Sequence, residues 1–200
     1  MIRILLIRHG STDPLGRVLY GRMPGVHLNA EGRRQAETVA QALKQRYTLS
    51  EVVSSPMERT RETAQFIADA QGLNITTEEE INEVDFGPWT GKSFEELRDR
   101  EDWKRFNESR STAWPPGGES MMDVQARASR TLAKITTRYQ HQENVTVAAI
   151  SHGDVVRALL LLMLGMPLDH IHRLDIAPAS VSEMMLGAGE PRVIHVNQVF

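Results

Sequence analysis

Two short, almost uninterrupted apolar runs constrain the fold of this chain more than any other feature. Ile2–Ile7 consists of isoleucine and leucine apart from Arg3, and Val145–Ile150 is apolar throughout except for one threonine. A strand has this composition when both of its faces are covered, as in a parallel sheet between helical layers. Each run is followed by a polar residue, a histidine and a glycine, so the same two segments also point to a functional site.

Segments with helical periodicity alternate with the strand-like runs. Asn29 is a suitable cap for a helix that continues to about Arg46, with apolar residues on one face. Further helices are predicted over residues 55–70, 93–107, 120–138 and 155–164, further strands over 51–54 and 74–77, and two closing strands between 176 and 196 around a turn at 187–191. This alternation predicts an α/β fold, namely a three-layer α/β/α sandwich with a mostly parallel central sheet.

The length of 200 residues favours a single domain over residues 1–200. Two segments stand apart from the regular alternation. Residues 11–29 are rich in glycine and proline and are predicted to form a long loop, of a kind that is usually functional when ordered. Residues 78–118 are polar, acidic and aromatic and end in Pro115-Pro116-Gly117-Gly118, which indicates a lid or insertion.

Composition excludes several classes of function. A net charge of −3 and a pI near 6.2 provide no overall basic field, so we expect neither a nucleic acid nor a membrane as partner. The absence of cysteine excludes disulfides, thiolate metal sites and cysteine nucleophiles, and is compatible with the cytoplasm, where we expect the protein. The apolar stretch at the N-terminus is too short for a secretory signal, and the longest apolar run, 158–164, is far below the roughly 20 residues that span a bilayer.

Charged residues follow three of the predicted strands. Arg8-His9-Gly10 and Ser151-His152-Gly153 end the two apolar runs, and Arg59 lies in the first turn of the helix after 51–54, where we expect Ser55 as the cap. In parallel sheets, ligands bind at the carboxyl ends of the strands. Because helix N-termini favour anions and arginine binds phosphate through two hydrogen bonds, these segments together predict an anion site.

The two histidines leave three interpretations open: a metal pair, a base with a nucleophile, or coincidence. A zinc site needs further His, Asp or Glu ligands at suitable spacing, and the chain has no His-x-x-x-His pair. The remaining candidates lie in segments that the pattern does not bring to this end of the sheet: His141, His170, His172 and His195. We therefore expect no metal.

Glu83 lies between apolar and aromatic neighbours in a glycine-rich loop. Partial burial would raise the pKa of its carboxyl group and suit it to general acid catalysis. Asp85 competes for this role, and a solvated loop carboxylate without function is the simpler alternative.

Considered together, five segments closely resemble motifs of the histidine phosphatase superfamily, in its phosphoglycerate-mutase-like branch. They occur in the expected order between Ile2 and Leu164: Leu6-Ile7-Arg8-His9-Gly10, Ser54 to Ala64, Asn82-Glu83 with Phe86 to Gly91, Gly117-Gly118-Glu119-Ser120, and Ser151-His152-Gly153.

The resemblance implies a metal-independent phosphatase that uses no cofactor. By that resemblance His9 is the nucleophile that becomes phosphorylated and Glu83 protonates the leaving oxygen, while the phosphoryl oxygens are held by Arg8, Arg59 and His152. The attacking nitrogen of His9 must be neutral, so we expect its other nitrogen to donate to a backbone carbonyl.

The chain departs from this branch in the loop after Gly10. Many members have an asparagine there that contacts the phosphate, and this chain has none before Asn29, which leaves Ser11, Thr12 or Arg22 as replacements.

Three functions stay open: a phosphomonoester hydrolase, a phosphoglycerate-mutase-type phosphoryl transferase, and a non-catalytic module that binds a phosphorylated ligand or partner protein. The expected ligand is a small phosphomonoester. The comparatively short segment between Glu83 and His152 favours hydrolysis over a mutase reaction, and retention of both catalytic candidates disfavours a non-catalytic binding module. Sugar phosphates, phosphoglycerates, cobalamin precursors and nucleotides are all possible substrates, and aromatic residues of the predicted lid are candidates to enclose the leaving group: Trp89, Trp103 and Trp114.

Overall fold

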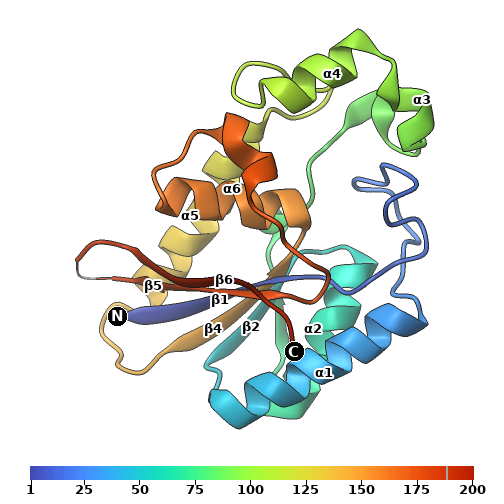
Figure 1. The fold of residues 1–200 in the computed structure, drawn as a ribbon. Helices are drawn as coiled ribbons and strands as arrows, with labels where there is room; N and C mark the ends of the chain where they lie inside the picture. The colour runs from blue at the N-terminus through green and yellow to red at the C-terminus, as the bar shows by residue number, and fades with distance from the viewer. Residues whose placement is uncertain (188) are drawn as a thin grey trace.

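The computed structural model describes residues 1–187 and 189–200, and within these residues six strands form one mixed sheet with helices on both faces (Figure 1). The strand order is β3-β2-β4-β1-β5-β6. The four strands that pair in parallel are β1 (Ile2–Arg8), β2 (Glu51–Ser54), β3 (Ile75–Thr77) and β4 (Thr146–Ser151). The α/β/α sandwich with a mostly parallel sheet is therefore confirmed.

Two pairs of helices cover the sheet. One face carries α1 (Ala30–Arg46) and α2 (Glu58–Gln71), and the other carries α5 (Met121–Arg138) and α6 (Gly153–Met163). Alternate residues of β1 enter the two hydrophobic cores: Ile4 and Leu6 pack toward α5 and α6, Leu5 and Ile7 toward α1 and α2. This double burial explains why the strand is apolar at consecutive positions.

Most predicted helix boundaries agree with the structure, but one capping prediction is wrong. The Asn29 side chain caps α1 by accepting a hydrogen bond from Gly32 N at 2.8 Å. In contrast, α2 begins at Glu58 with Met57 as the N-cap residue and no side-chain cap. The Ser55 hydroxyl instead contacts His152 Nε2 at 2.7 Å. The Ser55 side chain, which the local pattern assigned to the helix cap, makes a tertiary contact instead.

The predicted helix over 93–107 is divided into α3 (Phe94–Arg98) and α4 (Glu101–Glu108), because Arg100 has extended backbone angles. Two 3₁₀ turns, η1 (Glu79–Ile81) and η2 (Gly87–Trp89), precede them. In Figure 1, α3 and α4 lie beyond the sheet, away from the layer of α1 and α2. Three aromatic rings pack against one another in this region, with centroids 5.4 to 6.1 Å apart: Trp89, Trp103 and Phe106.

The closing strands, β5 (Val181–Leu186) and β6 (Arg192–Gln198), are antiparallel to their neighbours, and a 3₁₀ segment, η3 (Leu168–Arg173), links α6 to them. The turn predicted at 187–191 includes residue 188, which lies outside the described residues. Within the described ranges, every helix is too short or too polar to span a bilayer.

Candidate active site

The carboxyl ends of β2, β4 and β1 lie side by side and bring the two histidines together. Arg8 pairs with Ser151, and Ser54 pairs with Ile150, so the residues that follow the three strands meet at one edge of the sheet. The imidazole centroids of His9 and His152 are 5.4 Å apart, with the rings inclined by 65°. The predicted convergence of the strand ends is confirmed.

His9 is held in one tautomer. Its Nδ1 lies 2.7 Å from the carbonyl oxygen of Gly10. Because a carbonyl oxygen only accepts, Nδ1 carries the hydrogen and Nε2 keeps its lone pair. Burial, with Arg59 and Arg8 nearby, lowers the pKa of His9 well below its usual value. The ring is therefore neutral and nucleophilic at physiological pH.

Glycine is required at position 10 for steric reasons. A Cβ on Gly10 would lie 2.5 Å from the carbonyl oxygen of Gly32 in the first turn of α1. The Gly10 N–H donates to Thr63 Oγ1 of α2 at 3.1 Å. The segment that carries His9 is therefore fixed against both helices of this layer.

His152 is fully buried beneath His9. Its Nδ1 lies 3.2 Å from Arg59 Nη2, which donates, so Nε2 carries the hydrogen and donates to the Ser55 hydroxyl. Burial lowers the pKa of His152 well below its usual value, and the nearby Arg59 adds to this effect. An anion placed beside it would reverse this shift and favour the charged ring, which then donates from both nitrogens.

Arg59 is a buried cation with unused donors. Its Nη2 donates to the carbonyl oxygen of Gly21 at 2.7 Å, and its guanidinium carbon lies 4.8 Å from the centroid of the Tyr20 ring. Among the described residues, Nε and Nη1 of Arg59 have no hydrogen-bond partner, and the same holds for the buried Nε of Arg8. Unpaired buried guanidinium donors are costly, and a phosphoryl group would satisfy them.

Glu83 lines the same pocket as Arg8 and His9. Burial and the negative charge of Asp154 raise its pKa to about 7, against the lowering effect of Arg59. Its Oε2 lies 3.6 Å from His152 Nδ1. A carboxyl group that titrates near neutrality suits a general acid that later acts as a base. Asp85, the competing candidate, uses a carboxylate oxygen to accept from Gly87 N and does not line the pocket.

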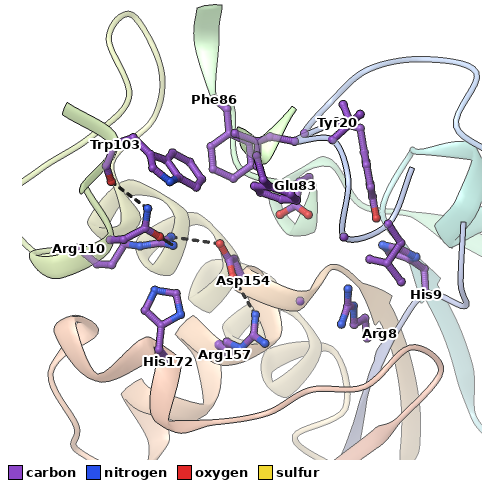
Figure 2. Close-up of a pocket in the computed structure, with 18 residues that line it drawn as sticks. Arg8, His9, Tyr20, Glu83, Phe86, Trp103, Arg110, Asp154, Arg157 and His172 are labelled. Carbon is purple, nitrogen blue, oxygen red and sulfur yellow. Dashed lines mark hydrogen bonds and ion pairs between the residues drawn. The ribbon is translucent and has the colours of Figure 1, made fainter. Parts of the chain in front are cut away.

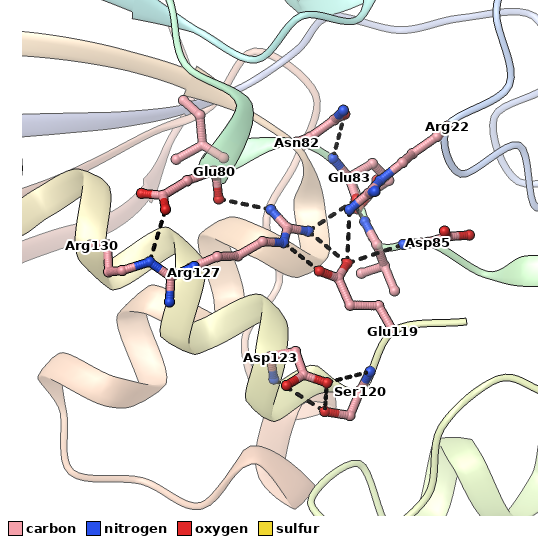
Figure 3. Close-up of polar contacts among 12 residues, drawn as sticks. Arg22, Glu80, Asn82, Glu83, Asp85, Glu119, Ser120, Asp123, Arg127 and Arg130 are labelled. Carbon is pink, nitrogen blue, oxygen red and sulfur yellow. Dashed lines mark hydrogen bonds and ion pairs between the residues drawn. The ribbon is translucent and has the colours of Figure 1, made fainter. Parts of the chain in front are cut away.

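A network outside the pocket holds the loop of Glu83 (Figure 3). The carboxylate of Glu119 accepts from both Arg22 and Arg127, and it also accepts from Asp85 N. The two arginines in turn donate to the backbone carbonyl oxygen of Glu83, at 2.7 and 3.0 Å. Glu119 belongs to Gly117-Gly118-Glu119-Ser120. This segment resembles a family motif, but the sequence did not indicate what it does.

Arg8, His9 and Glu83 line a pocket of about 230 Å³ (Figure 2), while Arg59 and His152 lie behind them, fully buried. The structure thus places all five predicted site residues together, three on the pocket surface and two in the layer beneath.

The loop after Gly10 contributes Tyr20 to the pocket, which sequence reasoning missed. Within the part of the chain that the structure describes, none of the three candidates for the missing asparagine lines the pocket, and the buried Thr12 hydroxyl has no hydrogen-bond partner. The Ser11 N–H donates to Gln35, and Arg22 donates to the Glu83 carbonyl oxygen and to the Glu119 carboxylate. In Figure 2 the Tyr20 hydroxyl points toward His9. A tyrosine in a glycine-rich loop gives no signal that distinguishes it from a packing residue.

The sequence pattern did not bring His172 to this end of the sheet, but the structure does. His172 lines the same pocket, on the outer side, with Arg110, Asp154 and Arg157 (Figure 2). The η3 segment returns over the end of α6, a connection that local patterns do not reveal. Of the three tryptophans, Trp103 reaches the pocket, Trp89 is buried in the core, and Trp114 is exposed.

No group of three or more histidine or acidic side chains with metal-binding geometry occurs in residues 1–187 or 189–200.

Comparison with known proteins agrees with this geometry. A bifunctional protein of Mycobacterium tuberculosis, Rv2228c, is 35% identical over 198 residues, which cover 96% of this chain and 53% of that protein. This chain thus spans about half the length of that relative. Phosphoserine phosphatase 1 of Hydrogenobacter thermophilus is 34% identical over 172 residues, covering 84% of this chain and 79% of the relative.

Among solved structures, the mycobacterial glucosyl-3-phosphoglycerate phosphatase Rv2419c in complex with VO3 has a TM-score of 0.87 at 27% identity, covering 98% of this chain and 99% of that one. Phosphoserine phosphatase from Entamoeba histolytica with 3-phosphoglyceric acid has a TM-score of 0.86 at 27% identity, covering 100% and 98%. Residues 4–199 match the model of one family, and the chain belongs to the histidine phosphatase superfamily (branch 1).

Proposed function

We propose that this chain is a phosphomonoester hydrolase that works through a phosphohistidine intermediate on a small phosphorylated metabolite. The observation that carries the proposal is the neutral His9 with a fixed Nδ1–H, surrounded by unpaired guanidinium donors and a carboxyl group that titrates near pH 7. The phosphatases named among its relatives act on phosphoserine and glucosyl-3-phosphoglycerate, which supports this class of substrate.

In the first step, His9 Nε2 forms a bond to phosphorus as the ester P–O bond breaks. Protonated Glu83 gives its proton to the leaving oxygen, so the alcohol departs neutral. The transition state spreads negative charge over three equatorial oxygens. We propose that Arg8, Arg59 and His152 stabilise these oxygens. The two arginines have unpaired buried donors among the described residues. His152, whose ring centroid is 5.4 Å from that of His9, becomes a donor at Nδ1 when the phosphoryl anion favours its charged form.

In the second step, water attacks the phosphorus atom and the P–N bond breaks. The Glu83 carboxylate accepts the proton from this water, which restores its acid form, and His9 Nε2 regains its lone pair. The cycle releases one alcohol and one inorganic phosphate. It needs no charge from a metal, since two guanidinium groups already face the phosphoryl position.

Phosphate release from a panel of phosphomonoesters in the presence of EDTA tests this proposal. We expect turnover together with an acid-labile, base-stable phosphoenzyme, and we expect His9→Ala to lose both. Retained turnover in His9→Ala would refute the mechanism. A wild-type protein that binds phosphomonoesters without turnover would instead be a binding module, and conversion of 3-phosphoglycerate into its isomer without phosphate release would indicate a mutase.

We also propose the domain and location that the sequence suggested. Residues 1–200 form one domain with a lid at about 78–118. The lid is supported by Phe94 of α3 and by Trp103 and Asn107 of α4, which line the pocket. A cytoplasmic location is supported by the absence of cysteine.

A further inference from the structure

The pocket extends outward past the position of the phosphoryl group. Its outer wall carries four charged or titratable side chains, which we term the outer cluster: Arg110, Asp154, Arg157 and His172. They come from the segment after α4, from α6 and from η3. Asp154 acts on the pKa of Glu83, but none of the four has a role at the reacting atoms in the steps described above. Their accumulation at one wall therefore requires another explanation.

The outer cluster has an excess of positive charge. Asp154 binds Arg110 Nη1 at 3.1 Å through one oxygen and Arg157 Nη1 at 3.0 Å through the other. Burial acts to raise the pKa of Asp154, but the two arginines outweigh it and keep the pKa below its usual value, so the carboxylate is charged. Two guanidinium groups against one carboxylate leave one net positive charge before His172 is counted.

The two arginines of the cluster are held in place by several contacts. Arg110 is 4% exposed, its guanidinium carbon lies 3.9 Å from the centroid of the Phe106 ring, and its Nη2 donates to Asn107. Arg157 Nε donates to the backbone carbonyl oxygen of Leu174 at 2.8 Å. Within the described ranges, Arg110 Nε is buried without a partner, and neither Arg157 Nη2 nor the ring of His172 makes a hydrogen bond. Preorganised donors of this kind lose little entropy when a ligand binds.

The outer cluster is continuous with the phosphoryl site. A Cβ on Gly153 would lie 3.4 Å from Arg157 Nη1 and 3.4 Å from Arg8 Nε. The two guanidinium groups therefore face the same point, one from each end of the pocket. Two like charges so close repel each other, and a ligand that carries negative charge at both ends would relieve this repulsion.

The pocket also has an apolar and aromatic wall. In Figure 2, Phe86 and Trp103 lie across the pocket from Arg157 and His172. A ligand that fills the pocket therefore has a phosphoryl group at His9, a carbon body against this wall, and an anionic group at the outer cluster. The accessible donors there are one guanidinium and one imidazole, which suits a monoanion better than a second phosphate dianion.

We propose that the outer cluster is a subsite for a carboxylate on the leaving group, so that the preferred substrates are phosphomonoesters of hydroxy acids. This inference rests on the proposed phosphatase function. The inner residues act on any phosphomonoester, and the outer cluster selects among them by the charge of the alcohol.

Two pairs of esters that differ at the carboxylate test the subsite. Phosphoserine is compared with phosphoethanolamine, and 3-phosphoglycerate with glycerol 3-phosphate, by kcat/KM for phosphate release. We expect each carboxylated ester to be preferred by at least about tenfold, equivalent to about 1.4 kcal/mol. Equal kcat/KM values within both pairs would overturn the inference and leave the phosphatase function intact.

Substitution of Arg157 tests the residue assignment. Arg157→Met removes the charge at nearly constant length, and we expect it to lower the ratio of kcat/KM within each pair about tenfold, whereas Arg157→Lys retains part of the preference. His172→Gln, at an exposed position, provides a second variant that perturbs folding little. Arg98→Met, on the exposed side of α3 and outside the pocket, is the matched control and should leave the ratio unchanged. A ratio unchanged in both Arg157→Met and His172→Gln would overturn the inference.

Absence of phosphate release from all four esters would count against the proposed function instead. In that event calorimetric binding of phosphoserine and phosphoethanolamine decides the inference: tighter binding of phosphoserine that is lost in Arg157→Met supports it, and equal binding overturns it.

Discussion

The backbone carbonyl oxygen of Glu83 accepts a hydrogen bond from Arg127 Nη2 at 3.0 Å, although Arg127 lies on α5 and does not line the pocket. Arg22 donates to the same oxygen from the opposite loop, and Glu119 binds both arginines. The position of the proposed acid is thus set by residues that cannot reach a substrate. Such residues act on catalysis by fixing geometry.

Glu119→Gln tests this arrangement. Loss of the Glu119 charge leaves Arg22 and Arg127 less compensated, so the pKa of Glu83 should fall and its loop should loosen. We expect kcat to drop about tenfold and the alkaline limb of kcat/KM to move to lower pH. Glu95→Gln on the exposed side of α3 is the control. An unchanged alkaline limb in Glu119→Gln, at normal thermal stability, would contradict a positioning role.

The pH dependence of the wild-type protein follows from Glu83. Its pKa is raised to about 7, so the acid form is present below this pH and is lost above it. We expect kcat/KM for alkyl phosphates to fall with increasing pH above about 7. Glu83→Gln should lower this rate about 10²- to 10⁴-fold, and should affect 4-nitrophenyl phosphate much less, because 4-nitrophenolate leaves without protonation. Equal losses for both kinds of ester would argue against an acid role.

The same pKa has a consequence for stability. The folded-state pKa of Glu83 lies above the unfolded value near 4.5, so folding favours the protonated carboxyl group. The protonated carboxyl group therefore adds about 3 kcal/mol to the free energy of unfolding. This stabilisation is fully present below about pH 4.5 and is lost as the pH rises through 7. Glu83→Gln is neutral at every pH, so it should be more stable than wild type at pH 8 and similar at pH 4.5.

Denaturant unfolding of both proteins at the two pH values measures this difference. If the free energies of unfolding of Glu83→Gln and wild type differ by the same amount at pH 4.5 and at pH 8, the Glu83 carboxyl group is not desolvated in the folded protein.

The sequence allowed prediction of the inner site in two ways. Local signals mark His9, His152 and Arg59, whereas the role of Glu83 came only from the resemblance to the family. His9 and His152 follow buried strands, and Arg59 follows a helix start, so the topology alone brings them to one edge of the sheet. Ser55 was misassigned because capping rules consider the local chain, and the contact with His152 lies 97 residues away. A local sequence pattern cannot reveal that such a distant residue competes with the helix for the Ser55 side chain.

The outer pocket could not be predicted for the same reason. His172 and Arg110 lie in segments without regular periodicity, and their positions depend on how η3 and the residues after α4 fold back over the site. The predicted helix over 93–107 is interrupted at Asp99 and Arg100. Aspartate favours caps and turns over helix interiors, and these exposed positions offer no packing that would keep the helix continuous.

Tyr20 provides the last prediction, because the loop after Gly10 places it in the pocket lining beside His9. Its ring covers Arg59, and its hydroxyl points toward His9. We expect Tyr20→Phe to keep the ring contact and lose one donor to the phosphoryl group, which should raise KM and the inhibition constant for inorganic phosphate about tenfold. Arg22→Ala, in contrast, should lower kcat with little change in KM, because Arg22 contacts the backbone of Glu83. The reverse pattern, with KM raised in Arg22→Ala and unchanged in Tyr20→Phe, would show that Arg22 and not Tyr20 replaces the asparagine.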